Sequence, residues 1–252
     1  MFPSAFSLQG RTALVTGANT GLGQAIAIAL AEAGADIVAV GRTDPSETAA
    51  AVLNTERRFI FVQADLANAD CMSTVAERVL AECAHIDILV NNAGMIRRSD
   101  AVDFTAADWD EVMDVNLKSA FFLTQAIGKR MIARGYGKVI NIASMLSFQG
   151  GIRVASYTAS KSAIAGLTRL LANEWACKGV NVNAIAPGYF ATNNTQSLRS
   201  DEKRNQDILA RIPAGRWGHP SDIGGAAVFL AAPASDYVHG AILPVDGGWL
   251  AR

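Results

Sequence analysis

The chain has 252 residues, half of them hydrophobic and 18% charged, which is typical of one α/β domain with a sizeable core. Lysine and arginine number 22 against 23 aspartate and glutamate, and the formal charge of −1 disfavours nucleic-acid binding and attachment to an anionic membrane. No apolar run reaches the roughly 20 residues of a membrane helix, no signal-like leader begins the chain, and the three cysteines and three histidines are scattered, so we expect a cytoplasmic protein without disulfides or a metal site.

Short apolar runs alternate with longer helical patterns along the whole chain. The predicted strands are Thr12–Thr16, Ile37–Val40, Phe59–Val62, Ile86–Val90, Lys138–Ile142, Val180–Ile185 and Ala241–Val245. The predicted helices are Gly21–Gly34, Ser46–Leu53, Asn68–Ala84, Ala106–Arg134, Ser156–Lys178 and Asp222–Ala231. This alternation predicts a single domain over residues 1–252, with a parallel sheet buried by helices on both faces and ligands beyond the carboxyl ends of its strands.

A glycine-rich turn follows the first predicted strand. The segment TGANTGLG places Gly17, Gly21 and Gly23 directly before a helix. Glycines at this spacing permit a tight turn and a close approach of the backbone to a pyrophosphate, which the helix N-terminus attracts. The turn therefore predicts a dinucleotide site, with a tight turn that binds no ligand as the alternative.

The end of the second predicted strand bears on the choice between NAD and NADP. Sites for NAD usually carry a carboxylate there that binds the ribose hydroxyls. This strand instead ends in Gly41 and Arg42, and Thr20 adds no second basic group to the glycine turn. Arg42 fits a 2′-phosphate, with a merely solvated arginine as the alternative, so the local residues leave both cofactors open.

Four polar residues indicate proton-transfer chemistry. Ser144 follows the predicted strand Lys138–Ile142, Tyr157 and Lys161 lie four residues apart on the next predicted helix, and Asn116 lies within an earlier one. A tyrosine and a lysine at this spacing arise readily by chance, and a solvated helix face is then the alternative. Together with the glycine turn, however, the arrangement is specific.

These motifs resemble those of the short-chain dehydrogenase/reductase family. TGANTGLG (16–23), NNAG (91–94), Asn116, Ser144, YTASK (157–161) and PG (187–188) occur in the family's order and cover essentially the whole chain. The resemblance implies a Rossmann-type, doubly wound sheet of seven strands, a nicotinamide cofactor and a homotetramer.

The resemblance also assigns roles to individual residues. It implies that Tyr157 is the general acid and base, that Lys161 stabilises the phenolate and holds the nicotinamide ribose, that Ser144 binds the substrate oxygen, and that Asn116 anchors a relay water. The implied cofactor contacts are the two catalytic residues Tyr157 and Lys161 together with Gly17, Asn19, Thr20, Gly21, Leu22, Gly23, Arg42, Asp65, Leu66, Asn92, Ala93, Gly94, Pro187, Gly188 and Thr192. For Asp65, a helix cap is the alternative.

Basic residues beside the cleft suggest an acidic substrate. Arg97 and Arg98 follow NNAG, and Arg153 lies between Ser144 and Tyr157, where a guanidinium suits a carboxylate; solvated arginines are the alternative. Gln149 is suited to sugar hydroxyls. The polar segment from Pro187 to Gly218 is expected to form a lid or substrate loop.

Longer stretches, such as NAIAPGYFATNNTQSLR and VDGGWLAR, resemble a branch of the family that acts on sugar-derived keto and hydroxy acids of uronate breakdown. That resemblance favours NAD, while Arg42 keeps NADP open. A reductase of gluconate or of 3-oxoacyl groups, and a nucleotide-sensing protein that performs no chemistry, are the alternatives.

Overall fold

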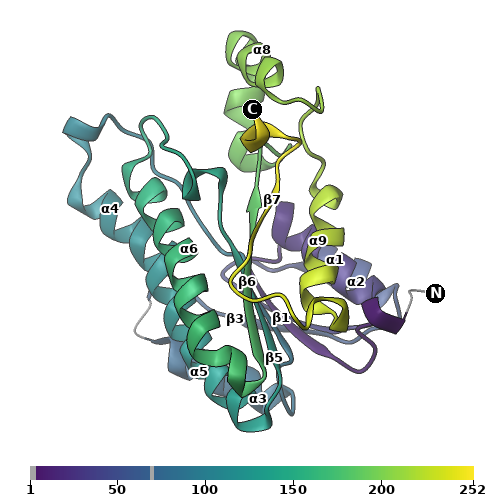
Figure 1. Cartoon of the computed structure of the whole chain (residues 1–252). Coiled ribbons are helices and arrows are strands. Elements are labelled where there is room, and N and C mark those ends of the chain that lie inside the picture. Colours follow the sequence, from purple (N-terminus) through teal and green to yellow (C-terminus); the bar gives the residue numbers. More distant parts are fainter. Residues whose placement is uncertain (1–3, 69–70) are drawn as a thin grey trace.

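The computed structural model of the protein describes residues 4–68 and 71–252, and it is built around a parallel sheet between two layers of helices (Figure 1). The strands are β1 (Thr12–Thr16), β2 (Asp36–Gly41), β3 (Phe59–Gln63), β4 (Ile88–Asn91), β5 (Gly137–Ile142), β6 (Val180–Pro187) and β7 (Ile242–Val245). The order across the sheet is β3-β2-β1-β4-β5-β6-β7, and each neighbouring pair runs parallel. The seven-stranded, doubly wound fold expected from the sequence is thereby confirmed.

Consecutive apolar residues form the central strands because both faces of the sheet are covered. Leu14 and Val15 of β1 are fully buried, yet they belong to hydrophobic clusters on opposite faces. Side chains along a strand alternate between its faces, so an apolar residue is needed at each position. Each predicted strand consequently lies within two residues of an observed one.

The helices form a layer on each face of the sheet (Figure 1). One layer contains α1 (Gly21–Glu32), α2 (Ser46–Leu53) and α9 (Gly224–Ala231). The other contains α3 (Met72–Glu82), α5 (Ser119–Arg134) and α6 (Ala155–Trp175), with α4 (Ala106–Met113) beside α6. The predicted helix Asn68–Ala84 corresponds to α3, and residues 69–70 of it lie outside the described residues. None of the helices in the described ranges is long and apolar enough to span a membrane.

The predicted single helix Ala106–Arg134 is interrupted in the structure. A π-helical turn over Asp114–Lys118 separates α4 from α5. Such a turn inserts one extra residue into a helix and often marks a functional position. Here it carries Asn116, which is buried.

Strand order reverses between β1 and β4, since the chain leaves β1 in one direction towards β3 and returns on the other side with β4. A crevice at the carboxyl ends of the strands is expected at such a point. The segment 187–218 rises beyond the same ends and contains α7 (Gln196–Ser200) and α8 (Glu202–Arg211), with the chain's C-terminus next to α8 (Figure 1).

Candidate active site

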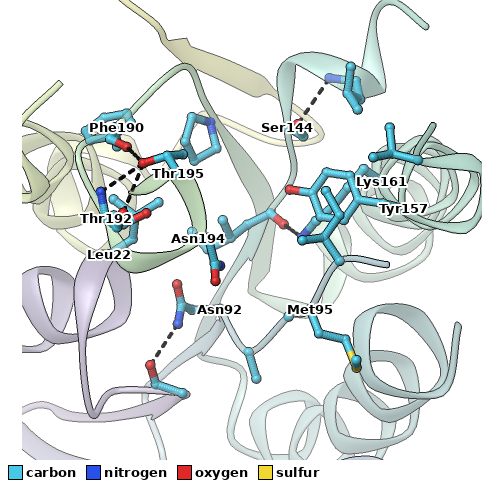
Figure 2. Close-up of a pocket in the computed structure, with 18 of the residues that line it drawn as sticks. Leu22, Asn92, Met95, Ser144, Tyr157, Lys161, Phe190, Thr192, Asn194 and Thr195 are labelled. Atoms are coloured by element: carbon cyan, nitrogen blue, oxygen red, sulfur yellow. Dashed lines mark hydrogen bonds between the residues drawn. The ribbon is translucent and has the colours of Figure 1, made fainter. Parts of the chain in front are cut away.

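A cleft of about 650 Å³ lies at the carboxyl ends of the strands. Its walls come from the turn after β1, the ends of β2 to β6, the start of α6, and the segment that carries α7 and α8. Figure 2 shows Tyr157 and Lys161 together on one side of this cleft, with Leu22 and Thr192 on the other. The sheet thus brings together the glycine turn and the predicted catalytic residues, which lie far apart in the sequence.

The glycine turn is shaped to approach a ligand closely. Gly17 and Gly21 have φ angles of 65° and 60°, in the left-handed region that favours glycine. A Cβ on Gly23 would collide with the carbonyl oxygen of Gly17 and the side-chain amide of Asn92. Thr20 precedes α1 and makes no side-chain capping bond, so the N–H groups of the first turn of α1 remain available to an anion.

Asn92 ties the glycine turn to the neighbouring strand. Its Nδ2 donates to the carbonyl oxygens of Thr16 and Gly17 at 2.9 and 3.1 Å. The Thr16 hydroxyl oxygen accepts hydrogen bonds from the backbone N–H groups of Asn92 and Ala93, both at 3.0 Å. NNAG therefore fixes the shape of the turn, and Asn92, Ala93 and Gly94 line the cleft beside it.

The end of the cleft beside β2 and β3, where we expect the adenosine, carries opposite charges. Arg42 Nε lies 3.9 Å from Asp65 Oδ1, and both side chains are more than half exposed. Asp65 also accepts a 3.0 Å hydrogen bond from the backbone N–H of Ala67, so this residue caps the local turn as well as lining the cleft. Leu66 is buried beside it.

The expected catalytic residues converge at the other end. Ser144 follows β5, and its hydroxyl accepts a 3.1 Å hydrogen bond from the Leu146 N–H and faces Tyr157, whose pKa it lowers. Lys161 lies one helical turn beyond Tyr157, with Nζ 5.6 Å from the centre of the tyrosine ring. The Lys161 ammonium is buried and donates a 2.6 Å hydrogen bond to the carbonyl oxygen of Ile142.

Burial dominates the acidity of this pair. It raises the pKa of Tyr157, which the hydrogen bond with Ser144 and the charge of Arg98 lower to a smaller degree. It also lowers the pKa of Lys161 to about 8. Arg98 is the cation whose charge lowers the pKa of Tyr157 in this structure, and the expected stabilisation of the phenolate by Lys161 stays a prediction.

Asn116 binds backbone rather than the catalytic lysine. Its Oδ1 accepts a hydrogen bond from the Met95 N–H at 2.8 Å, while its Nδ2 donates to the Met95 carbonyl at 2.9 Å and to the Ser160 hydroxyl at 3.3 Å. The π-helical turn thus places an amide between the loop after β4 and α6. The structure holds Asn116 near the catalytic residues, and its role in a proton relay stays a prediction.

Two of the expected substrate-binding arginines point elsewhere. Arg97 is held by Glu111 at 2.6 Å, and Arg153 by Asp100 at 2.9 Å, and neither lines the cleft. An exposed ion pair keeps each guanidinium at the rim, so this geometry does not support the expectation for Arg97 and Arg153. Arg98 and Gln149 do line the cleft.

Comparison with known proteins agrees with this geometry. A family model described as enoyl-(acyl carrier protein) reductase matches residues 17–250. The 2-dehydro-3-deoxy-D-gluconate 5-dehydrogenase of Escherichia coli is 61% identical over 253 residues, covering 100% of both chains. The chain belongs to the short-chain dehydrogenase/reductase family.

Two solved structures of this family add bound molecules to the comparison. An Agrobacterium tumefaciens protein with bound NADP is 60% identical, covers 99% of this chain and 100% of its own, and superposes with a TM-score of 0.91. A gluconate 5-dehydrogenase from Burkholderia cenocepacia, in complex with NADP and tartrate, is 40% identical with coverages of 99% and 98% and a TM-score of 0.93.

The residues of this family member fit a nicotinamide dinucleotide. The glycine turn offers N–H groups to a pyrophosphate and has no room for a Cβ at Gly23. Pro187, Gly188 and Thr192 line the cleft on the side opposite Tyr157 and Lys161. The chain is therefore a nicotinamide-dependent oxidoreductase.

Three residues that line the cleft were missed as site residues in the sequence analysis. Arg204, Arg211 and Trp249 all line the cleft, the first two from α8 and the third from the C-terminal turn. A helical spacing was present, because Arg204, Ile208 and Arg211 occupy positions i, i+4 and i+7. The sequence alone did not indicate which face of α8 lines the cleft.

Proposed function

We propose that the protein interconverts 2-dehydro-3-deoxy-D-gluconate and 3-deoxy-D-glycero-2,5-hexodiulosonate by hydride transfer. The observation that carries this proposal is the convergence of Ser144, Tyr157 and Lys161 in one cleft whose substrate end is basic. The high identity to a dehydrogenase of this sugar acid over the full chain supports the choice of substrate.

The chain's own residues handle the proton and the orientation of the substrate. The nicotinamide, when bound, accepts or supplies the hydride at the reacting carbon. Tyr157 takes the proton of the substrate hydroxyl during oxidation and returns it during reduction, and Ser144 binds the same oxygen. Because burial raises the pKa of Tyr157, the phenol is kept in its proton-donating form, which suits reduction of the ketone.

Arg98 favours an acid as the substrate. Its guanidinium lines the same cleft as Tyr157, and its charge lowers the pKa of the Tyr157 phenol. A cation at this position stabilises both the phenolate and an anionic substrate. A 3-oxoacyl thioester, whose acyl group carries no carboxylate, gains less from it.

Arg42 supports NADP as the cofactor. It lies at the end of β2, where a 2′-phosphate is bound in this class of site, and its guanidinium is exposed and only loosely paired with Asp65 at 3.9 Å. NADP is bound in both solved relatives described above. The preference for NAD expected from the sequence is therefore less well supported than NADP. A homotetrameric state and a cytoplasmic location are kept as proposals.

Paired kinetics test the proposed function. NADPH and NADH are compared on the diketo acid, on 5-ketogluconate and on an acyl thioester, with wild type, Tyr157→Phe and Arg42→Ala. We expect the diketo acid to have the highest kcat/KM. Tyr157→Phe should abolish turnover while retaining cofactor affinity, and Arg42→Ala should weaken NADPH by about tenfold, roughly 1.4 kcal/mol, and NADH little. The highest kcat/KM on the acyl thioester, or full activity of Tyr157→Phe, would overturn the proposal.

A further inference from the structure

The inner face of α8 presents two arginines on either side of a buried anchor. Arg204, Ile208 and Arg211 lie on one face of the helix, and both arginines line the cleft. Ile208 is buried in a hydrophobic cluster with Trp249 and with Met145, the residue that follows catalytic Ser144. This packing places the arginine face of α8 over the substrate end of the cleft.

An aromatic platform holds this face in position. The guanidinium of Arg211 lies 3.9 Å from the centre of the Trp249 ring, and Tyr189 stands edge-on between Trp249 and Trp217, at 4.8 and 5.4 Å. The Trp217 indole N–H donates a 2.7 Å hydrogen bond to Asn205 Oδ1 on α8. A guanidinium stacked on an aromatic ring is pre-oriented, and its in-plane N–H groups remain available to an anion.

The arginines of α8 differ from several others in their charge partners. Arg97, Arg153 and Arg216 each form an ion pair with a neighbouring carboxylate. Within residues 4–68 and 71–252, Arg204 and Arg211 form none. Two cations therefore face the cleft without a neutralising carboxylate, although the chain as a whole has a formal charge of −1.

The acidic lining of the cleft lies at its opposite end. Among the described residues that line it, Asp65 is the one acidic side chain, and it is next to Arg42 at the adenosine end. The glycine turn already offers a pyrophosphate site there. Arg204 and Arg211 are tied through Ile208 to the residue after Ser144, so the anion that they meet belongs to the substrate rather than to the cofactor.

We propose that Arg204 and Arg211 bind the carboxylate of the substrate and that this pair on α8 determines specificity for acids over neutral polyols. The inference rests on the proposed function and adds to it the residues that read the acid group. Arg98 acts on Tyr157, where the substrate reacts, whereas the arginines of α8 would bind the carboxylate at the other end of an extended substrate. A sugar acid oxidised several carbons from its carboxylate would meet Arg98 at its reacting oxygen and the arginines of α8 at its carboxylate.

The test compares the double variant Arg204→Gln/Arg211→Gln with the control Lys203→Gln. Lys203 is on the same helix, is exposed and does not line the cleft, so its substitution removes a charge without touching the site. KM and kcat are measured with the sugar acid. Calorimetry in the presence of NADP gives Kd values for D-gluconate, which has a carboxylate, and for galactitol, a six-carbon polyol without one. The affinity for NADP is measured separately.

We expect the double variant to raise KM and the Kd of gluconate by about 10- to 100-fold, as for lost charge-assisted hydrogen bonds. The Kd values of galactitol and of NADP should stay unchanged, and Lys203→Gln should behave as wild type. The conservative Arg204→Lys/Arg211→Lys variant should recover part of the gluconate affinity, which a merely structural role would not predict.

Equal weakening of gluconate and galactitol, or a parallel loss of NADP affinity, would overturn the inference. The single variants, each at an exposed position, provide the same comparison if the double variant is unstable. A failure of the proposed function would be seen instead in the wild type, which would then fail to turn over the diketo acid or would prefer the acyl thioester. The two calorimetric Kd values would still report whether Arg204 and Arg211 recognise a carboxylate.

Discussion

Replacing Lys161 by methionine should abolish activity and yet stabilise the protein near neutral pH. Burial lowers the pKa of Lys161 from its ordinary value of 10.5 to about 8. One pKa unit corresponds to about 1.4 kcal/mol, so keeping this ammonium charged inside the fold costs about 3 kcal/mol below pH 8. Methionine has a similar length and no charge, but it cannot donate the 2.6 Å hydrogen bond to Ile142, worth about 1 kcal/mol. The net gain at pH 7 is about 2 kcal/mol.

The pH dependence identifies the cause of this gain. Between pH 8 and 10.5 the folded protein binds fewer protons at Lys161 than the unfolded chain does, so wild-type stability contributed by this group rises with pH. The advantage of Lys161→Met should therefore fade over that window. Urea unfolding of the dinucleotide-free protein at fixed concentration, from pH 7 to 10, measures it, with the exposed Lys178→Met as control. A destabilised variant at pH 7, or a difference that does not vary with pH, would refute the reasoning.

Three further predictions follow from the contacts described above or elsewhere in the fold. Gly23→Ala should destabilise the protein by about 1–3 kcal/mol and weaken NADP binding, because a Cβ at this position collides with the backbone of Gly17. A thermal melt measures the stability and a cofactor titration the affinity, and an unchanged affinity for NADP would contradict the prediction. Asp236→Ala should cost about 1–2 kcal/mol, because Asp236 lies 2.7 Å from the ammonium of the buried Lys138 but is itself more than half exposed. Adding Lys138→Met should restore most of this loss in urea unfolding, and a neutral single variant argues against the pair. Arg98→Gln should raise the pKa of Tyr157, so the acidic limb of the pH profile of kcat/KM for oxidation should move to higher pH. An unchanged acidic limb would show that Arg98 does not act on Tyr157.

The sheet and the catalytic residues could be predicted because burial and local spacing leave strong signals. Leu14 and Val15 had to be apolar in a strand covered on both faces. Tyr157 and Lys161 had to share a helix face at a separation of four residues. The glycine turn could likewise be predicted, because a residue with a Cβ does not fit at position 23.

The features of the site that the sequence did not predict depend on contacts between elements that are distant in the chain. Arg97 and Arg98 are neighbours on an irregular loop, and Arg97 turns away from the cleft because it pairs with Glu111 and Asp108 on α4. Arg153 has a φ angle of 62°, a left-handed backbone that sequence patterns do not reveal for arginine. The π-helical turn at Asn116 was invisible because one inserted residue barely changes a helical pattern.

The hydrogen bonds that Asn92 donates to the glycine turn link cofactor recognition to the order in which the chain folds. Asn92 and Gly17 are 75 residues apart, and their contact exists only once β4 has paired with β1. A ribosome-bound chain from which only β1 to β3 have emerged already contains the glycine turn. It still lacks the side-chain amide of Asn92, which donates to the carbonyl oxygens of Thr16 and Gly17. Dinucleotide can therefore act as a folding ligand only after the two halves of the sheet have met, and an amino-terminal fragment ending before β4 should not be rescued by it.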